Sequence, residues 1–411
     1  METDVTEIFH VLNEIKVALK SLDRWASETP VSAPLYLPGT RSWIVYEPRG
    51  VCLVISPWNY PFSLAAGPLT SAIAAGNSIV LKPSEMTPAV SSLIRKMCHE
   101  IFDPGIVAVC EGGVAVSQAL LALPFDHIFF TGSPTVGKIV MKAAAENLTS
   151  ITLELGGKSP AIVTESSRLN DAAERIAVGK FLNNGQTCIA PDYLFVHNSI
   201  AEEFIRKLIE KTKRLYAPND DLERSADYGR VINESNYTRI ENLVADAIDR
   251  GAKLEWKGTN NKEARFMHPV ILTHVPPGSL VLEEEIFGPV LPVIVYHTIE
   301  EVVATINSKP KPLALYIFTN SNAEYKDILK RTSSGSVCIN ECGVQFLHHE
   351  LPFGGVNTSG IGKAHGYSGF LAFSNEKPVL KQKNGLTAVK AFYPPFTPAT
   401  QKVMDWFLKL F

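Results

Sequence analysis

The stretch VCLVISPWNYPFSLAAGPLTSAIAAGNSIVLKP, residues 51–83, decides the fold. It contains two apolar runs, VCLVIS at 51–56 and SIVLKP at 78–83, and the residues between them have helical character near 65–75. A second helical segment near 87–102 continues the pattern. Apolar runs that alternate with helices indicate βαβ units and a parallel sheet. The stretch therefore predicts an α/β fold that begins with a Rossmann-like cofactor domain.

The residues that follow extend this domain. DHIFFTG at 126–132 is typical of a strand, and VGKIVMKAAAENL at 136–148 is typical of the helix after it. TLELGGKSPAIV at 152–163 resembles a further strand pair around a tight Gly-Gly turn. We therefore place the cofactor domain at residues 1–156.

A second α/β unit, the expected catalytic domain, follows at residues 157–357. Its predicted helices lie near 168–184, 199–216 and 234–250, and its predicted strands lie near 193–197, 290–295 and 314–318. Two segments remain outside both units. A strand within about 33–48 and the C-terminal residues 358–411, with a short helix at 398–410, predict a small bridging hairpin.

The N-terminal segment 4–26 places apolar residues at steps of three and four, which predicts an amphipathic helix. The apolar stripe consists of Ile8, Leu12, Ile15, Leu19 and Leu22. We expect this stripe to pack on the body of the protein.

Composition excludes several classes of partner. The formal charge is −3 and no long basic run is present, so nothing provides the positive surface that nucleic acid needs. The first residues are acidic and no apolar span reaches membrane length, which predicts neither a secretory signal nor a transmembrane segment.

Six cysteines in 411 residues do not form a dense disulfide pattern, so we expect reduced thiols and a cytoplasmic protein. Cys338 and Cys342 lack a second Cys/His pair at zinc-site spacing, so we predict core thiols and no metal.

Cys188 is the candidate nucleophile. It follows a polar, Gly-containing turn in FLNNGQTCIAPDY at 181–193, where a thiol could face a cleft. A reactive cysteine needs access and help in forming the thiolate, because a free thiol has a pKa of about 8.5. A single cysteine is more often an inert core residue, and only the other motifs favour the reactive interpretation.

Glu154 and Asn59 could assist such a thiol. Glu154 ends an apolar strand beside a Gly-Gly turn, where partial burial would raise its pKa and make it a base toward water. Asn59 lies in SPWNYPF at 56–62, and its side chain, with the Cys188 backbone N–H, could donate to an oxyanion. The alternatives are that Glu154 caps the turn and that Asn59 stabilises one.

Several residues lie where a nucleotide could bind. Lys82 and Glu85 follow a predicted parallel strand, at whose carboxyl end nucleotides bind in open α/β sheets, and could hydrogen-bond ribose hydroxyls. The turn GSPTVG at 132–137 could direct backbone N–H groups at a pyrophosphate, although it is not a GxGxxG motif. Glu285 and Phe287 precede a Gly-Pro turn and could contact a nicotinamide ribose and ring. Solvated surface charge and ordinary turns are the alternatives.

Seven strings together resemble the aldehyde dehydrogenase superfamily, in order and spacing from about residue 40 to 370. They are PWNYPF, GNSIVLKPSE, FTGSPTVGK, TLELGGKSP, NNGQTCIAPDY, EEEIFGPVLP and LPFGGVNTSGIG. APDY after the cysteine and the C-terminal YPPFTP resemble the class 3 branch of fatty and aromatic aldehyde dehydrogenases.

The resemblance implies a role for each matched residue. Cys188 would be the nucleophile, Glu154 the general base and Asn59 the oxyanion donor. The dinucleotide would be surrounded by Lys82, Glu85, Gly132, Ser133, Gly137, Glu285 and Phe287. The resemblance also implies the aldehyde dehydrogenase fold, with a hairpin used in homodimers. The substrates it implies are medium- to long-chain aliphatic or aromatic aldehydes. Glu85 would repel a ribose 2′-phosphate, which favours NAD, although class 3 relatives can often use NADP as well.

Two features depart from the family pattern. Class 3 relatives carry more helix before the point that matches the start of this sequence, so the front of the cofactor domain and part of the substrate tunnel are expected to be short. Pro134 lies in the turn expected to face phosphate and lacks an N–H. Two rival functions stay open. One is a CoA-acylating dehydrogenase, against which Glu154 argues because it is a carboxylate that can activate water. The other is a catalytically silent relative, shortened at its front, with a structural or binding role.

Overall fold

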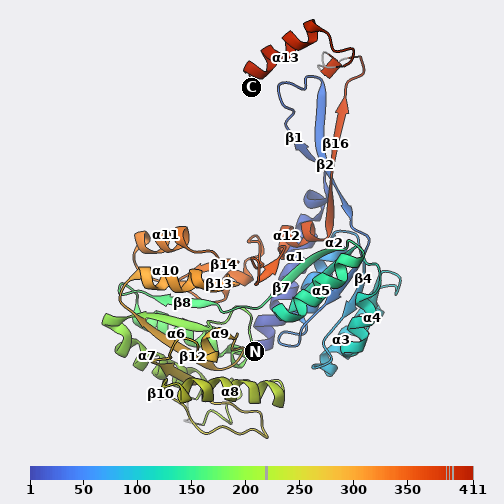
Figure 1. Ribbon diagram of the computed structural model, residues 1–411. Coiled ribbons are helices and arrows are strands. Elements are labelled where there is room, and N and C mark those ends of the chain that lie inside the picture. Colours follow the sequence, from blue (N-terminus) through green and yellow to red (C-terminus); the bar gives the residue numbers. More distant parts are fainter. Residues whose placement is uncertain (218–220, 386, 388, 391–392, 411) are drawn as a thin grey trace.

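The computed structural model describes residues 1–217, 221–385, 387, 389–390 and 393–410. Its body contains two sheets flanked by helices, and an arm of three strands and a helix projects from it (Figure 1). Both sheets are mostly parallel, so the predicted α/β fold class is confirmed.

The first sheet has the order β15-β7-β6-β3-β4-β5. Its strands are β3 (Val51–Ile55), β4 (Ser78–Lys82), β5 (Val107–Val109), β6 (His127–Gly132), β7 (Ser150–Leu155) and the short antiparallel β15 (Gly360–Ile361). The connecting helices are α2 (Ser63–Ala74), α3 (Pro88–Ile101), α4 (Val114–Leu121) and α5 (Pro134–Glu146). The chain runs outward from β3 through β4 to β5 and then returns to β6 on the other side of β3. This reversal of strand order creates the kind of crevice, at the carboxyl ends of β3 and β6, where open α/β sheets bind ligands.

The second sheet has the order β10-β11-β12-β9-β8-β13-β14. Its strands are β8 (Pro160–Val163), β9 (Tyr193–His197), β10 (Lys253–Trp256), β11 (Val270–Thr273), β12 (Val290–Tyr296), β13 (Ala314–Phe318) and β14 (Ser336–Ile339). The helices of this part are α6 (Leu169–Phe181), α7 (Ala201–Tyr216), α8 (Glu234–Asp249), α9 (Leu280–Glu283), α10 (Ile299–Ser308) and α11 (Asn322–Arg331). Short 3-10 turns η2 (Leu182–Gly185), η3 (Asn198–Ile200) and η4 (Val344–Leu347) complete it. Apolar residues of the two sides of this sheet form two buried clusters, which make it the larger core.

The predicted strand pair at 152–163 is wrong. β7 pairs with β6 and β15 in the first sheet, whereas β8 pairs with β9 and β13 in the second. The Gly-Gly segment is therefore a crossing from one sheet to the other rather than a hairpin turn. Both strands are buried for most of their length, and burial alone does not reveal which partners a strand has.

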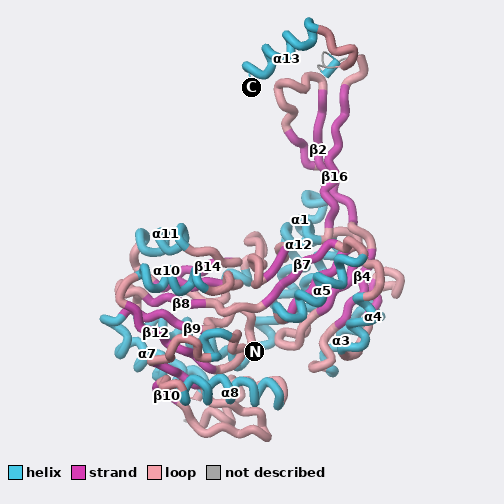
Figure 2. The backbone as a smooth tube through the Cα atoms, viewed as in Figure 1, coloured by secondary structure: helices cyan, strands magenta, loops and turns pink. Residues whose placement is uncertain are grey.

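The arm joins segments from both ends of the chain. It consists of β1 (Thr29–Val31), β2 (Thr40–Pro48) and β16 (Ser374–Gln382), all antiparallel, and α13 (Pro398–Leu410) lies beyond them (Figures 1 and 2). β2 and β16 pair over their full length, from Thr40 opposite Gln382 to Pro48 opposite Ser374. β2 lies inside the range 33–48 in which a strand was predicted, so that strand is confirmed, and α12 (Gly366–Ala372) links the arm to the body.

The N-terminal helix forms, but its predicted buried face is wrong. A π-helical turn η1 (Asp4–Ile8) leads into α1 (Phe9–Ala26). The exposed fraction is 51% for Leu12 and 75% for Leu19, so much of the apolar stripe faces outward. The buried side chains of this segment are Glu7, His10, Val11, Glu14 and Trp25. Three of these five are polar, so the helix directs polar groups into the protein.

Among the described residues, no helix combines the length and the apolar character that crossing a bilayer requires.

Candidate active site

A sharply turned segment presents Cys188. After α6 the backbone passes through left-handed conformations at Asn183, Asn184 and Gly185, with φ of 48°, 56° and 74°. A Cβ on Gly185 would lie 2.4 Å from the carbonyl oxygen of Gly288. Only glycine fits there, because it has no Cβ and tolerates positive φ. The cysteine segment is thereby packed directly against the loop that carries Glu285 and Phe287.

Cys188 and Glu154 line the same cavity. The thiol is free and half-buried. Burial raises the pKa of Cys188 to about 12, and the negative charges of Glu285 and Glu154 raise it further in the same direction. The resting thiol is therefore protonated at neutral pH, and it becomes a nucleophile only when a base or a positive charge joins it.

Glu154 is a buried carboxyl group without a partner. It lies on β7, is 6% exposed, and neither carboxyl oxygen has a hydrogen-bond partner among the described residues. Burial raises its pKa well above the usual 4.5, while the positive charge of Lys363 acts in the opposite direction. A raised pKa makes the ionised carboxylate a stronger base, as general-base catalysis toward water requires.

Asn59 contacts the segment that precedes the cysteine. Its Nδ2 donates to the Gln186 carbonyl oxygen at 3.0 Å, and Asn183 Nδ2 donates to the Asn59 carbonyl oxygen at 2.8 Å. The neighbouring Tyr60 hydroxyl lies 2.6 Å from the Thr187 hydroxyl. The amide is thus fixed beside the nucleophile loop, and one of its two amide hydrogens is free for another acceptor.

The predicted nucleotide residues lie at the carboxyl edge of the first sheet. Lys82 ends β4, is 3% exposed, and its Nζ pairs with Glu85 Oε2 at 2.7 Å. Gly132 ends β6, and Ser133 caps α5 by accepting from the Val136 N–H at 3.4 Å. The start of α5 directly follows the end of β6 at the topological crevice, a position at which a helix end can bind a dinucleotide phosphate.

Two residues explain how α5 reaches that position. A Cβ on Gly137 would lie 2.7 Å from Leu155 Cδ2, so glycine lets α5 pack closely on β7. Pro134 occupies the first turn of α5, where an N–H has no partner within the helix. The missing donor is therefore compatible with the helix start.

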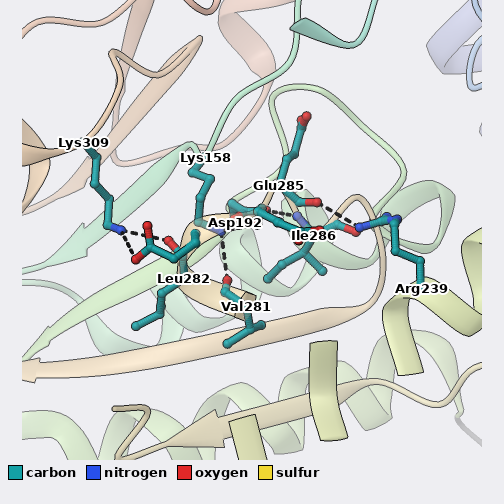
Figure 3. Close-up of polar contacts among 10 residues, drawn as sticks. Lys158, Asp192, Arg239, Val281, Leu282, Glu285, Ile286 and Lys309 are labelled. Atoms are coloured by element: carbon teal, nitrogen blue, oxygen red, sulfur yellow. Dashed lines mark hydrogen bonds and ion pairs between the residues drawn. The ribbon is translucent and has the colours of Figure 1, made fainter. Parts of the chain in front are cut away.

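Glu285 and Phe287 lie on a loop that three cations hold. Lys158 pairs with Asp192 and donates to the carbonyl oxygens of Val281 and Glu284 at 2.9 and 2.7 Å (Figure 3). Arg239 donates to the carbonyl oxygens of Glu285 and Ile286 at 3.1 and 2.7 Å. Lys309 donates to the Leu282 carbonyl oxygen at 2.8 Å. Asp192 Oδ1 also accepts from the Ile286 N–H at 2.9 Å, so the loop backbone is fixed on both sides.

The Glu285 carboxylate takes no part in this anchoring. Figure 3 shows the carboxylate pointing away from the anchors. It packs on Gly156, where a Cβ would lie 2.2 Å from its Oε2. Burial and the charge of Asp192 raise the pKa of Glu285 to about 8, and the Gly157 backbone N–H lowers it. Phe287, at φ 48°, packs edge-on against Trp58 at 5.4 Å between ring centroids.

Two of these anchoring residues, Lys158 and Asp192, lie within the sequence motifs, but neither of them was given a role from the sequence. Lys158 follows the Gly-Gly crossing and Asp192 follows the nucleophile segment. Both are charged residues next to an apolar strand. A charge at such a place is expected to be buried and to need a partner, and this was the signal that could have indicated them. No local pattern indicated Arg239 or Lys309, whose partners lie far away in the sequence.

The chain matches the Aldehyde dehydrogenase family over residues 1–379. It is 43% identical over 390 residues to the Mus musculus protein "Aldehyde dehydrogenase, dimeric NADP-preferring". The match covers 95% of this chain and 84% of that protein. It is 40% identical over 403 residues to Mus musculus "Aldehyde dehydrogenase family 3 member A2", covering 98% and 82%. The solved substrate-bound state of Staphylococcus aureus AldH superposes with a TM-score of 0.93 at 40% identity, covering 99% of this chain and 88% of that one.

These matches confirm the class 3 resemblance, and further solved neighbours are complexed with NAD+ or NADP. They show an oxidoreductase that acts on aldehydes with NAD(P). The chain belongs to the aldehyde dehydrogenase family.

Proposed function

We propose that this aldehyde dehydrogenase converts medium- to long-chain aliphatic or aromatic aldehydes to carboxylic acids through a thioester on Cys188. The observation that carries the proposal is that Cys188 and the partnerless Glu154 line one cavity. The cavity wall is largely apolar, with Phe129, Phe346 and Phe353 among its residues, which suits an apolar aldehyde.

The residues divide the reaction into two parts. The Cys188 thiol first releases its proton to water, a loss that the positive charge of NAD(P)+ would favour once the cofactor is bound. The thiolate then adds to the aldehyde carbon, and Asn59 Nδ2 and the Cys188 backbone N–H donate to the oxyanion. NAD(P)+, when bound, supplies the acceptor for the hydride that leaves this carbon. Glu154 then takes a proton from water, whose oxygen attacks the thioester, and the acid leaves as the thiol is restored. Aldehyde, water and NAD(P)+ thus give acid, NAD(P)H and one proton.

The dinucleotide would be held by residues from both sheets. Lys82 and Glu85 would contact the adenosine ribose, and Gly132 and Ser133 would face the pyrophosphate at the start of α5. Gly137 would allow the close packing of that helix, and Glu285 and Phe287 would contact the nicotinamide side. Glu85 favours NAD over NADP because its carboxylate repels a 2′-phosphate, and a comparison of kcat/KM for the two decides this preference.

The assignment of the nucleophile is tested by Cys188→Ser, assayed as NADH absorbance with hexanal or benzaldehyde. We expect kcat/KM to fall by at least about 1,000-fold, since covalent catalysis is lost. Cys110→Ser is the matched control, because Cys110 is also a half-buried free thiol but does not line the cavity. Full activity in Cys188→Ser would refute the thioester route.

The same assay with and without CoA distinguishes the two rivals. A CoA-acylating enzyme would require CoA for sustained turnover, whereas we expect turnover in its absence because Glu154 can activate water. A silent relative would give no NADH with either addition.

The domain and assembly assignments complete the proposal. We assign residues 1–156 to NAD(P) binding, 157–357 to catalysis and 358–411, with the strand in 33–48, to bridging between subunits. The projecting arm and the dimeric Mus musculus relative support a homodimer. Free thiols at all six cysteines support a cytoplasmic location. Light scattering of the full chain, compared with a variant that carries charged residues on the arm, tests the assembly.

A further inference from the structure

The buried face of α1 meets a histidine from the far end of the chain. His10 and Glu14 lie one helical turn apart and are 2% and 4% exposed. His365, which precedes α12, reaches the same place. Each of the three offers one ligating atom, and these atoms lie within 4.8 Å of one another.

Two ring nitrogens in this cluster lack a partner. Nδ1 of His10 and Nδ1 of His365 are buried, and neither has a hydrogen-bond partner among the described residues. A buried polar atom without a partner destabilises the fold, so each of these two nitrogens calls for a ligand.

The surrounding contacts orient the ligands as a metal site requires. His349 Nδ1 lies 2.9 Å from Glu14 Oε1, and the Gly366 N–H donates to Glu14 Oε2 at 3.2 Å. The His365 ring packs edge-on against Phe346, 4.6 Å away between ring centroids. Such outer contacts fix the tautomer and direction of metal ligands. His365 Nδ1 lies 3.7 Å from Glu14 Oε1, close to the ~3.3 Å between two ligands of a tetrahedral zinc ion with bonds of about 2.0 Å.

We propose that His10, Glu14 and His365 form a Zn²⁺ site on the wall of the cavity that also contains Cys188. Two histidines and a carboxylate are the donor set of zinc sites that keep a fourth position open. All three residues line the cavity, so the fourth position would be filled by water or by a ligand in the cavity. The sequence motifs did not indicate this site, because its ligands are two residues of one helix and a third more than 300 positions away.

The test is a competition titration of the metal-free full chain with Zn²⁺ against a chromogenic chelator. We expect one tight site per chain, weakened by at least about 100-fold in His10→Phe and in His365→Gln, since losing a ligand costs more than losing an outer contact. The exposed His99→Gln is the control for surface histidines. His10→Phe keeps a ring that can stack on Phe346, now 4.5 Å away between centroids, so it should retain the fold.

A second readout excludes binding by the thiol. Co²⁺ in the same site should give tetrahedral d–d bands without a thiolate charge-transfer band, and Cys188→Ser should bind Zn²⁺ as tightly as the parent chain. The proposal is overturned if no stoichiometric site is found, if both histidine variants keep full affinity, or if Cys188→Ser abolishes binding.

One consequence for activity rests on the proposed function. An ion at this site would narrow the cavity, so Zn²⁺ should inhibit aldehyde oxidation in the parent chain and should not do so at the same concentration in His10→Phe. Stoichiometric Zn²⁺ binding in a chain without NAD-linked activity would refute the proposed function and leave the metal site standing.

Discussion

Two buried carboxyl groups line the same cavity and differ in what surrounds them. Glu14 accepts a hydrogen bond from the Gly366 N–H and another from His349. Glu154 has no hydrogen-bond partner among the described residues. Both groups are removed from water, since they are 4% and 6% exposed.

The difference separates a carboxyl group whose oxygens the protein holds in place from one whose oxygens are free to accept a proton. Asn13 Nδ2 contacts His349 Nε2, which makes that nitrogen the acceptor and leaves the Nδ1 hydrogen to donate to Glu14. Glu14 thereby ties α1 to the segments around His349 and Gly366. An unpaired buried carboxyl group destabilises a fold, and functional sites are where such a cost persists. Three measurements on two variants test this contrast.

The largest effect is expected for Glu154→Gln. The amide cannot accept a proton from water, so steady-state kcat should fall by about 100- to 10,000-fold. Thioester formation does not need this base, so a rapid burst of about one NADH per site should remain before turnover stalls. Stopped-flow absorbance measures both phases, with the exposed Glu376→Gln as the control. An unchanged steady-state rate would remove Glu154 from its role.

A smaller effect, on stability, is expected for Glu14→Ala. The change leaves the Gly366 N–H and His349 without their acceptor in a buried place, which should lower the free energy of unfolding by about 2–3 kcal/mol. Urea denaturation followed by circular dichroism measures the loss. If the free energy falls by less than about 0.5 kcal/mol, as for a typical surface substitution, Glu14 is not the structural carboxyl group of the pair.

The contrast also shows what the sequence could and could not predict. The apolar runs around residues 51–83 predicted the parallel sheet, because continuous burial leaves a continuous apolar pattern. The same argument failed for 152–163, where two buried strands of different sheets adjoin. Periodicity predicted the helix α1 but chose the wrong face, since Glu7, His10 and Glu14 recur with the same helical period as the apolar stripe.

The candidate site shows the same division. Cys188, Glu154 and Asn59 were recognisable because each belongs to a local motif with turns that position it. The cations that hold the Glu285 loop act through backbone carbonyl groups of distant residues, as Arg239 does. Any lysine or arginine at the right distance could donate to these carbonyl oxygens. No pattern in the sequence therefore predicts which residue does so before the fold is known.

The smallest effect concerns how the stability contributed by Glu154 depends on pH. The folded state raises the pKa of Glu154 above its usual 4.5, so between these two values the unfolded chain binds fewer protons than the folded one. The stability of the parent chain should therefore fall as pH rises from about 4.5 through the raised pKa. Glu154→Gln carries no charge at any pH and lacks this loss.

The variant should therefore be more stable than the parent chain at pH 8, where the parent must keep its buried carboxyl group protonated or leave a charge without a partner. Its advantage should shrink toward pH 4.5, where the parent carboxyl group is also neutral. Thermal unfolding at several pH values measures the difference, and Glu376→Gln again serves as the exposed control. A constant difference across this range would mean that Glu154 is not held in the destabilised state that distinguishes it from Glu14, even if its removal stops catalysis.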